Sequence, residues 1–526
     1  MELKLLMKTA RSAVLEIADG GIYHTLESYH LFVNGHDRKT CDTVITSVFG
    51  LVPGTDYRFD IVHEALGCEE ASAGDVLASI EFTTPDEFVT IDVRELGAKG
   101  DGVSDDTLFI QSAISLCPEG GRVLIPEGRY LVTSVFLKSG INIELSKDAV
   151  ILADTDRHHY PALPGLIQSY DEQDEYNLGT WEGNPLPMFT GIITGMNIKD
   201  VCIYGEGCID GQASYENWWH DCKLMNIAFR PRLIFLSHCS NITIQGIRLC
   251  NSPSWTLHPY YSDDLGFYNL VIENPQDSPN TDGMDPESCS NVDIEGIRFS
   301  LGDDCIAIKS GKIYMARNHR KMSENILIRQ CLMENGHGAV TVGSEMAGGI
   351  RGVKVEDCLF RNTDRGLRIK TRRGRGRDAV MDDISFWHIE MRNVMTPFVV
   401  NAFYFCDPDG KTEYVQSREA LPADDRTPHI GRLAFEDINA TGCHVAAAYF
   451  DGLPEDKIEE IIMRNVNISF ADDARKDVPA MSVGVEKCCK KGIYARNICR
   501  LELSDVNITG YEGEMIDADG IDELAN

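Results

Sequence analysis

Three aspartates stand close together in the stretch NTDGMDPESCSNVDIEGIRFSLGDDCIAIKSG, which covers residues 280–311. They are Asp282, Asp303 and Asp304. Asp beside Gly is an ordinary turn former, so each aspartate on its own predicts a turn. Carboxylates that meet in the fold could instead share protons and act as general acid and general base. The choice between the two interpretations depends on how the chain folds around these residues.

Two later stretches carry residues that could bind an anion. His337 lies in GHGAVTVGS, and Arg368 and Lys370 lie in RGLRIKT. Taken alone, His337 is as often a loop histidine as a functional one, and RIKTRRGRGR would ordinarily be a solvated loop. In a chain with a formal net charge of −33, however, such local positive charge favours an anionic ligand. Arg can bind a carboxylate through two parallel hydrogen bonds, and Lys supplies a point charge.

The elements that must position these residues are mainly strands. Apolar residues recur at positions p, p+2, p+5 and p+7, which predicts two short strands with one buried face and a bend between them. Several repeats start roughly 27–35 residues apart, which suits one coil of a solenoid. The longer intervals after Ile242 and after Ile384 suit a loop insertion or a missed coil. The repeats are Ile242-Ile244-Ile247-Leu249, Val292-Ile294-Ile297-Phe299, Ile326-Ile328-Cys331-Met333, Val353-Val355-Cys358-Phe360, Ile384-Phe386-Ile389-Met391, Leu433-Phe435-Ile438-Ala440, Ile461-Met463-Val466-Ile468 and Leu501-Leu503-Val506-Ile508.

This repeat distinguishes between fold classes. A β-sandwich does not need it, and a βαβ fold would show a helical pattern between the strands. We therefore predict an all-β chain in which residues 92–526 form a right-handed parallel β-helix, that is, a solenoid. One amphipathic helix near 104–116, with Ser104 as its N-cap, is expected to cover the N-terminal end of the coils.

Residues 1–86 differ from the rest of the chain. Short alternating runs such as AVLEI, YHLFV and TVITSVF are separated by polar turns at about ten-residue intervals. This spacing predicts a small antiparallel β-sandwich domain. The region resembles a fibronectin type III-like domain, and TTPDEF is interpreted as the linker that follows it.

A solenoid would bring the chemically interesting residues together. Residues one coil apart in sequence become neighbours about 4.8 Å apart. Asp282 and Asp303 are one short coil apart, His337 follows about one coil later, and Arg368 and Lys370 about one coil after that. The sequence therefore predicts a strip on one outer face in which carboxylates are followed by potential cations.

The same residues carry a family resemblance. Asn280-Thr281-Asp282, the GDD at 302–304, the GHG at 336–338 and the RIK at 368–370 resemble the signature motifs of polygalacturonases, glycoside hydrolase family 28. The motifs occur in the family's order, and the resemblance spans roughly residues 92–510. It implies a right-handed parallel β-helix that hydrolyses α-1,4-linked galacturonan with inversion.

Carried over by motif, the resemblance implies a role for each acidic residue. Asp303 would be the general acid, Asp282 and Asp304 would activate the attacking water, and Asn280 would help to position the water-activating acid. An inverting pair of carboxyl groups is expected to stand about 6.5–9.5 Å apart, so that the water fits between them.

The resemblance also implies substrate-binding residues. His337 would tune the acid or hydrogen-bond to it, and Arg368 and Lys370 would grip the substrate carboxylate next to the scissile bond. A tyrosine usually follows the RIK motif by about thirty residues in this family, and Tyr404 is the best match. No cofactor and no metal is implied, since a pectate lyase would use calcium and a basic proton abstractor.

Whether such an enzyme cuts at a chain end or within the chain depends on whether a segment closes one end of the groove that binds the substrate. The stretch 158–189 and a second one that begins near Asn401 could close it, although either could equally be solvated decoration. A sandwich ahead of the β-helix resembles the arrangement of bacterial exo-acting members. We therefore expect an exo-polygalacturonase that acts on galacturonate oligomers or polymers from the non-reducing end. The alternatives are an endo-polygalacturonase, a rhamnogalacturonan or xylogalacturonan hydrolase, and, in a different class, a non-catalytic carbohydrate-binding β-helix.

The composition excludes some partners and suggests a compartment. The 526 residues are 43% hydrophobic, and the strong acidity argues against nucleic acid and against adhesion to an anionic membrane. The N-terminal residues lack the features of a secretory signal, and no apolar run is long enough for a membrane span. The 17 scattered cysteines suggest reduced core residues. We expect a cytoplasmic protein, or a secreted or periplasmic one if the sequence is a mature fragment.

Overall fold

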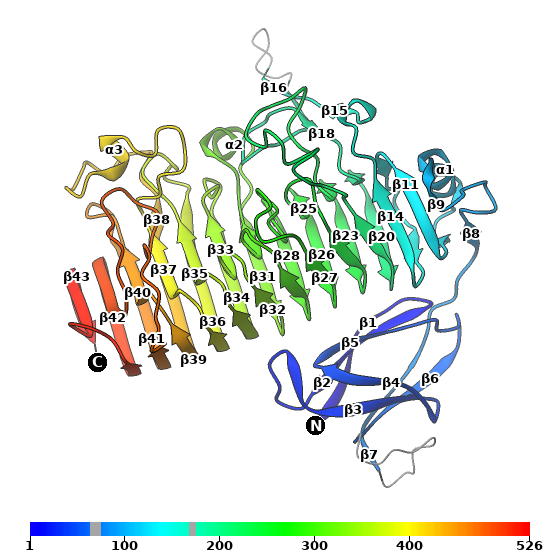
Figure 1. Cartoon of the computed structure of the whole chain (residues 1–526), viewed down its shortest axis with the longest axis horizontal. Helices are drawn as coiled ribbons and strands as arrows, with labels where there is room; N and C mark the ends of the chain where they lie inside the picture. The colour runs from blue at the N-terminus through cyan, green and yellow to red at the C-terminus, as the bar shows by residue number, and fades with distance from the viewer. Residues whose placement is uncertain (64–74, 168–174, 526) are drawn as a thin grey trace.

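The chain consists of a small antiparallel β-sandwich followed by a long stack of parallel coils (Figure 1). The computed structural model describes residues 1–63, 75–167 and 175–525. Within these ranges no helix is long and apolar enough to cross a membrane. The fold confirms the predicted parallel β-helix with an N-terminal sandwich.

The N-terminal sandwich contains two antiparallel sheets, ordered β1-β2-β5 and β4-β3-β6-β7. Apolar side chains from both sheets, among them Leu15, Leu31 and Phe59, form its buried core. The next strand, β8, already pairs with a strand of the β-helix. The sandwich strands are β1 (Glu2–Lys8), β2 (Ser12–Ala18), β3 (His24–Val33), β4 (His36–Thr43), β5 (Ile45–Phe49), β6 (Asp56–His63) and β7 (Val76–Thr83).

The coils of the β-helix have three faces. Along each face, successive strands pair in parallel. The strands of the first face are β8 (Thr90–Asp92), β10 (Arg122–Ile125), β13 (Asn142–Leu145), β20 (Lys199–Gly205), β23 (Ser240–Gln245), β26 (Asp263–Tyr268), β28 (Ser290–Glu295) and β31 (Ser323–Arg329). The strands of the second face are β9 (Asp101–Asp105), β11 (Gly128–Val132), β14 (Ala149–Ala153), β21 (Cys208–Asp210), β24 (Arg248–Cys250), β27 (Val271–Glu273), β29 (Arg298–Ser300) and β32 (Leu332–Glu334). Longer strands then run through both faces, namely β34 (Ile350–Arg361), β36 (Val380–Arg392), β39 (Arg432–Cys443), β41 (Ile458–Phe470) and β42 (Lys491–Thr509), and the last strand is β43 (Ile516–Ala525).

Most of the predicted site residues lie in the third face or in the turns that lead into it. Between its fourth and fifth strands, residues 284–287 continue the face through isolated bridges to Leu257 and Ile306. Its strands are β12 (Val135–Phe136), β19 (Ile193–Met196), β22 (Ile234–Ser237), β25 (Leu257–Tyr260), β30 (Ile306–Ile308), β33 (Val340–Gly343), β35 (Arg365–Lys370), β37 (Thr396–Asn401) and β40 (Ala446–Asp451).

The predicted repeat corresponds to the corner between the first and second faces. Position p+4 has a left-handed φ in all eight repeats, at Gly246, Gly296, Gln330, Asp357, His388, Asp437, Asn465 and Asp505. A single left-handed residue turns the chain sharply, which explains why two apolar pairs need one extra residue between them. One coil was missed by the sequence analysis: Leu265, Phe267, Leu270 and Ile272 form the same pattern, and Leu265 pairs with both Ile242 and Val292. The long interval after Ile384 is instead a loop insertion.

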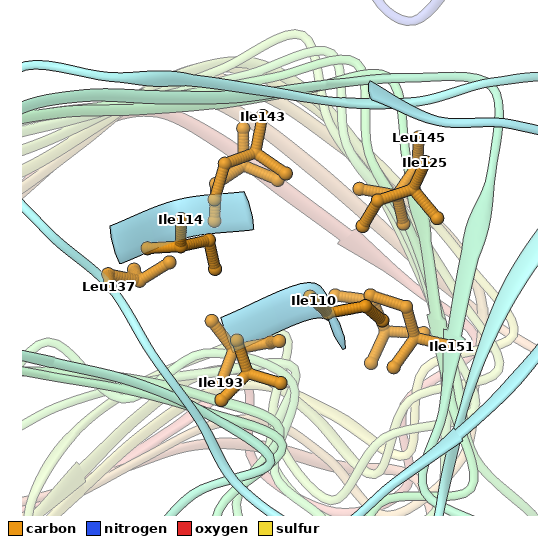
Figure 2. A pocket seen from close by; sticks show the side chains of 11 residues that line it. Ile110, Ile114, Ile125, Leu137, Ile143, Leu145, Ile151 and Ile193 are labelled. Carbon is orange, nitrogen blue, oxygen red and sulfur yellow. The ribbon is translucent and has the colours of Figure 1, made fainter. Parts of the chain in front are cut away.

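One helix closes the N-terminal end of the coils, as expected. In α1 (Thr107–Leu116), Ile110 and Ile114 point into the end of the core, among Ile125, Ile143 and other aliphatic side chains (Figure 2). The void left between these side chains is only about 10 Å³. The expected N-cap was wrong: the residue at that position is Asp106, and Ser104 belongs to β9.

Insertions between the coils gather at the edge that is uppermost in Figure 1, whereas the sandwich lies below the coils. The sandwich packs on the corner between the first and second faces, where Phe49 meets Gly246 and Ile45 meets Gly296. The inserted elements are 3-10 helix η2 (Arg157–His159), β15 (Ala162–Leu163), β16 (Gly165–Ile167), β17 (Glu175–Asn177), β18 (Met188–Phe189), α2 (Ile313–Asn318) and α3 (Glu413–Gln416), whereas β38 (His429–Ile430) pairs with β36 as part of the coils.

Candidate active site

The three predicted aspartates come together on neighbouring coils. Asp282 lies just before the third-face segment 284–287, and Asp303 and Asp304 lie just before β30. The backbone N–H of Gly283 donates to the carbonyl oxygen of Asp304 at 3.0 Å, which fixes the two turns side by side. One carboxylate oxygen of each aspartate lies within 4.8 Å of the others. The coiled backbone thus builds the carboxylate cluster that the sequence predicted.

The separation of these carboxylates is shorter than expected. An inverting pair was expected to stand about 6.5–9.5 Å apart, yet the closest oxygens lie within 4.8 Å. The reason is geometric: Asp303 and Asp304 are consecutive, and Asp282 occupies the adjacent coil, where strand spacing is about 4.8 Å. Asp282 and Asp304 are also recessed, at 4% and 1% exposure, whereas Asp303 is partly exposed.

Asp304 is held by the two cations of the RIK motif. Arg368 Nη1 donates to Asp304 Oδ1 at 3.0 Å, and Lys370 Nζ donates to Asp304 Oδ2 at 2.8 Å. Burial alone would raise the pKa of Asp304, but Lys370 and Arg368 outweigh burial and lower it. Asp304 is therefore a carboxylate that stays ionised. The structure places both cations on this acid, and their contact with a substrate carboxylate remains a prediction.

One glycine, Gly338, makes room beside these ion pairs. Arg368 pairs in register with Thr341 on the preceding coil, and Lys370 with Gly343. A Cβ at Gly338 would overlap Thr341 Oγ1 and would lie 2.9 Å from Asp304 Oδ1 and 3.4 Å from Arg368 Cβ. The second glycine of the GHG motif is therefore required by the close approach of Thr341 and Asp304 to its backbone.

Asp282 has an unusual protonation equilibrium. Burial raises its pKa, the charges of Asp303 and Asp285 raise it further, and Lys309 lowers it. Two carboxylates this close do not ionise independently, so the site retains a proton to higher pH than a lone aspartate would. One carboxyl kept protonated beside the ionised Asp304 is the combination that general acid and general base catalysis requires.

His337 lies at the edge of the cluster and is half exposed. Its backbone N–H donates to the carbonyl oxygen of Asp303 at 3.0 Å. The imidazole Nδ1 lies 2.8 Å from Asp364 Oδ2. The hydrogen bond to Asp364 raises the pKa of His337, burial lowers it, and the charges of Asp303 and Asp304 raise it further. His337 is thus oriented by Asp364 and held beside the predicted acid.

Asn280 lies on the other side of the cluster from Arg368. Its side-chain oxygen accepts from Arg230 Nη2 at 2.9 Å and from Lys223 Nζ at 3.3 Å. Arg230 itself is 4% exposed and also donates to the carbonyl oxygens of Pro253 and Pro279. Two cationic donors thus fix the amide of Asn280 close to Asp282.

Tyr404 lies near the cations but does not contact the aspartates in any interaction of the described residues. The ammonium of Lys370 stands 5.6 Å from the centre of the Tyr404 ring. The Tyr404 backbone N–H donates to the carbonyl oxygen of Thr371 at 3.1 Å. Burial raises the pKa of its hydroxyl, so this phenol stays neutral. The tyrosine packs on the side of Lys370, at the rim of the predicted site.

Sequence reasoning missed several charged residues here, among them Arg230, Asp364 and Lys309. Lys309 is 3% exposed, with its Nζ 3.4 Å from Asp285 Oδ1 and 3.3 Å from Glu345 Oε2. A signal existed for Lys309, because it lies in the quoted GDDCIAIKSG stretch and directly follows the alternating inward residues Ile306 and Ile308. Arg230 and Asp364 gave no signal, since insertions and turns bring them to the site.

The three aspartates are also the group whose spacing, among the described residues, would suit a metal ion. Both oxygens of Asp304 already accept from Arg368 and Lys370, however. A divalent cation would have to compete with two fixed positive charges at the same carboxylate. The donor set therefore fits a metal poorly.

Comparison with known proteins identifies the family. A "Probable polygalacturonase" of Vitis vinifera is 32% identical over 433 residues, covering 79% of this chain and 83% of the relative. A hyperthermoactive exopolygalacturonase from Thermotoga maritima superposes with a TM-score of 0.63 at 25% identity, covering 80% of this chain and 91% of the other. The family 28 exopolygalacturonase of Yersinia enterocolitica superposes with a TM-score of 0.70 at 18% identity, covering 99% and 98% of the two chains, so its fold extends over the sandwich as well. The model of "Glycosyl hydrolases family 28" matches residues 173–489, and the chain belongs to that family.

Proposed function

We propose that the protein is an inverting glycoside hydrolase that cleaves the α-1,4-galacturonosidic bonds of polygalacturonate and its oligomers, from the non-reducing end. The observation that carries hydrolysis is the cluster of Asp282, Asp303 and Asp304, whose oxygens lie within 4.8 Å of one another. The cations Arg368 and Lys370 stand directly beside it. A sugar acid is the kind of substrate that such a pairing of acids and cations suits.

The exposure of the three acids supports their separate roles. Asp303 is the most accessible of the three and is placed to protonate the glycosidic oxygen. Asp282 and Asp304 are recessed, and in this proposal the attacking water lies over them, on the side of the sugar. Asp304, kept ionised by its cations, is then the acceptor for a proton of that water. This recess supports inversion even though the carboxylates are close together.

Exo action is supported by segments that cover the third face on both sides of the catalytic coils. On the N-terminal side, the segment 180–184 lies over the face: Trp181 stacks on Arg232, 4.7 Å from the ring centre, and Lys312 N–H donates to the Gly183 carbonyl oxygen. Within the predicted stretch 158–189, residues 168–174 lie outside the described residues.

On the C-terminal side, the segment 478–483 crosses the face just beyond Arg368. Arg368 Nη2 reaches Met481 Sδ at 2.9 Å, and Asn401 Nδ2 donates to the Met481 carbonyl oxygen at 3.2 Å. A segment that covers the face on one side of the aspartates is enough to stop a polymer from passing through, which favours binding of a chain end over binding in the middle of a polymer. The likeness to the Thermotoga exopolygalacturonase supports the same proposal.

Digestion of a hexagalacturonate labelled at its reducing end tests both parts of the proposal. Exo action releases mono- or digalacturonate first, and the label stays on chains that shorten stepwise; an early spread of mid-sized labelled products would mean endo action. Proton NMR of the first turnover distinguishes inversion from retention, because an inverting enzyme frees the β-anomer from an α-linkage. An initial α-anomer would contradict the roles given to Asp282 and Asp304.

We further propose that the N-terminal sandwich is fibronectin type III-like. Its three-stranded and four-stranded antiparallel sheets support this assignment. A search for the sandwich's closest folds, made with residues 1–86 alone, would test it.

A further inference from the structure

A galacturonan carries one carboxylate on every sugar, so the two sugars at the scissile bond bring two negative charges. Arg368 and Lys370 are two cations that lie on the Asp304 side of the cluster. The opposite side, next to Asp282, also carries cations, namely Arg230 and Lys223, which meet at Asn280. These two residues lie outside the motifs of the family.

Arg230 is a buried cation whose hydrogen bonds go to neutral oxygens. Its acceptors are the carbonyl oxygens of Pro253 and Pro279 and the amide oxygen of Asn280. Its Nε–H is buried without a hydrogen-bond partner, and the indole of Trp181 lies 5.5 Å from the guanidinium. A guanidinium with this much unbalanced charge is an unusual feature of a protein interior, because burial of an unpaired charge is costly.

Lys223 is exposed, and its ammonium has capacity to spare. An ammonium has three N–H donors, and Lys223 uses one of them on Asn280 Oδ1 at 3.3 Å. Among the residues that the structure describes, neither Lys223 nor Arg230 forms an ion pair with a carboxylate, whereas Arg368 and Lys370 both do. Both cations also fix the amide of Asn280 with its oxygen toward them, so its NH₂ group faces away from them.

We infer that Lys223 and Arg230 form a second anion subsite, which takes the carboxylate of the sugar on the Asp282 side of the scissile bond. This inference rests on the proposed function. Lys223 supplies the direct contact from the surface, and Arg230 supplies positive charge from below while it holds Asn280. The two cationic pairs then flank the aspartates, so a substrate with a carboxylate on each side fits both.

Binding of trigalacturonate to the Asp303→Asn protein, measured by calorimetry, tests the subsite without turnover. Adding Lys223→Met should weaken binding about tenfold, as expected for one charge-assisted hydrogen bond at an exposed position, and should flatten the dependence of Kd on salt. Lys223→Arg should restore most of the affinity. Lys354→Met, which removes an exposed lysine on β34, is the matched control and should leave Kd unchanged.

A Kd for Lys223→Met within twofold of the parent would overturn the inference, as would a loss that Lys223→Arg does not restore. A variant that binds normally but turns over slowly would mean that Lys223 only positions Asn280, which also contradicts the subsite. The proposed function is tested separately, by release of reducing sugar from polygalacturonate by the wild-type protein. Cleavage by the wild type together with an unaltered Kd would remove the subsite and leave the hydrolase.

Discussion

Replacing Lys370 with Met should remove one of the two cations that keep Asp304 ionised, while an aliphatic side chain still fills the same space. Lys370 Nζ donates to Asp304 Oδ2 at 2.8 Å, and the two residues are 8% and 1% exposed. In the variant Asp304 keeps Arg368, whose Nη1 lies 3.0 Å from Oδ1, but loses its other cation. The substitution therefore changes the charge beside Asp304, a proposed catalytic carboxylate, more than it changes the shape of the site.

The magnitude follows from that one contact. A hydrogen bond to a charged group contributes about 1.5–3 kcal/mol, and about 1.4 kcal/mol corresponds to a factor of ten, so kcat/KM should fall about 10- to 100-fold. Burial tends to raise the pKa of Asp304, and once Lys370 no longer helps Arg368 and Lys309 to oppose burial, the pKa rises. Since the proposed mechanism has the ionised form of Asp304 accept the proton of water, the acid limb of the pH profile should move to higher pH.

The effect of Lys370→Met on the free energy of unfolding should also depend on pH. Because the folded-state pKa of Asp304 is lowered, the ionised group contributes stability above the ordinary Asp pKa of about 3.9 and loses this contribution as the pH falls toward its folded-state value. The difference in Tm between Lys370→Met and wild type should therefore be larger at pH 7 than near pH 3.

The assay is kcat/KM for a short oligogalacturonide across the acid range, with Tm measured by calorimetry on the same samples. Lys321→Met is the control, because Lys321 also loses a carboxylate partner, Asp263 at 2.7 Å, but at a partly exposed position. A raised KM with the acid limb unmoved would refute the reasoning, since it would mean that Lys370 acts on the substrate alone.

Three further predictions concern the same site. Asp303→Asn should lower kcat by several orders of magnitude with little change in Tm, and an intact rate would show that the acid is assigned wrongly. Asp364→Asn removes the largest cause of the raised pKa of His337, so the alkaline limb of the kcat/KM profile should move to lower pH, whereas an unmoved limb would separate His337 from catalysis. Gly338→Ala would overlap Thr341, and overpacking of this kind costs about 1–3 kcal/mol; calorimetry should show a lower Tm, and an unchanged Tm and rate would contradict the tight packing of the site.

The fold could be predicted because its repeat is local. Each apolar pair fixes a strand face, and the left-handed residue between pairs fixes the corner, so one coil can be recognised without knowledge of the others. The coil that starts at Leu265 follows the same pattern. It was not recognised because it starts fewer residues after the preceding repeat than one coil was expected to span. The N-cap at Ser104 was wrong because Asp106, not Ser104, directly precedes the helix, and its carboxylate accepts instead from the backbone N–H groups of Lys99 and Gly100.

The contacts of the site were less predictable than its residues. Asp282, Asp303 and Asp304 could be grouped from coil spacing alone, since neighbouring coils must stack. Arg368 and Lys370 bind Asp304 because their side chains extend back over the preceding coil. The spacing of these residues in the sequence does not predict that contact. The position of Arg230 depends on the course of an insertion, which has no repeat to follow.

The distance between the carboxylates shows how the fold limits the chemistry. In a solenoid, carboxyl groups on one side of the coils come from the same coil or from coils separated by multiples of the strand spacing, about 4.8 Å. Asp303 and Asp304 share a coil and Asp282 lies on the adjacent one, and one oxygen of each lies within 4.8 Å of the others. In the proposed mechanism, room for water then comes from the difference in depth between the partly exposed Asp303 and the buried Asp282 and Asp304.

The two glycines among the corner residues indicate what the sandwich does. Gln330, Asp357 and His388 adopt the same left-handed φ with a side chain, so backbone conformation alone does not demand glycine at Gly246 and Gly296. A Cβ at these two positions would overlap Phe49 and Ile45 of the sandwich. The glycines therefore make room for the docked domain, on the corner between the first and second faces and away from the aspartates of the third. From that position the sandwich can brace the coils that carry Asp282 and Asp304, but it cannot line the site where the sugar is cut.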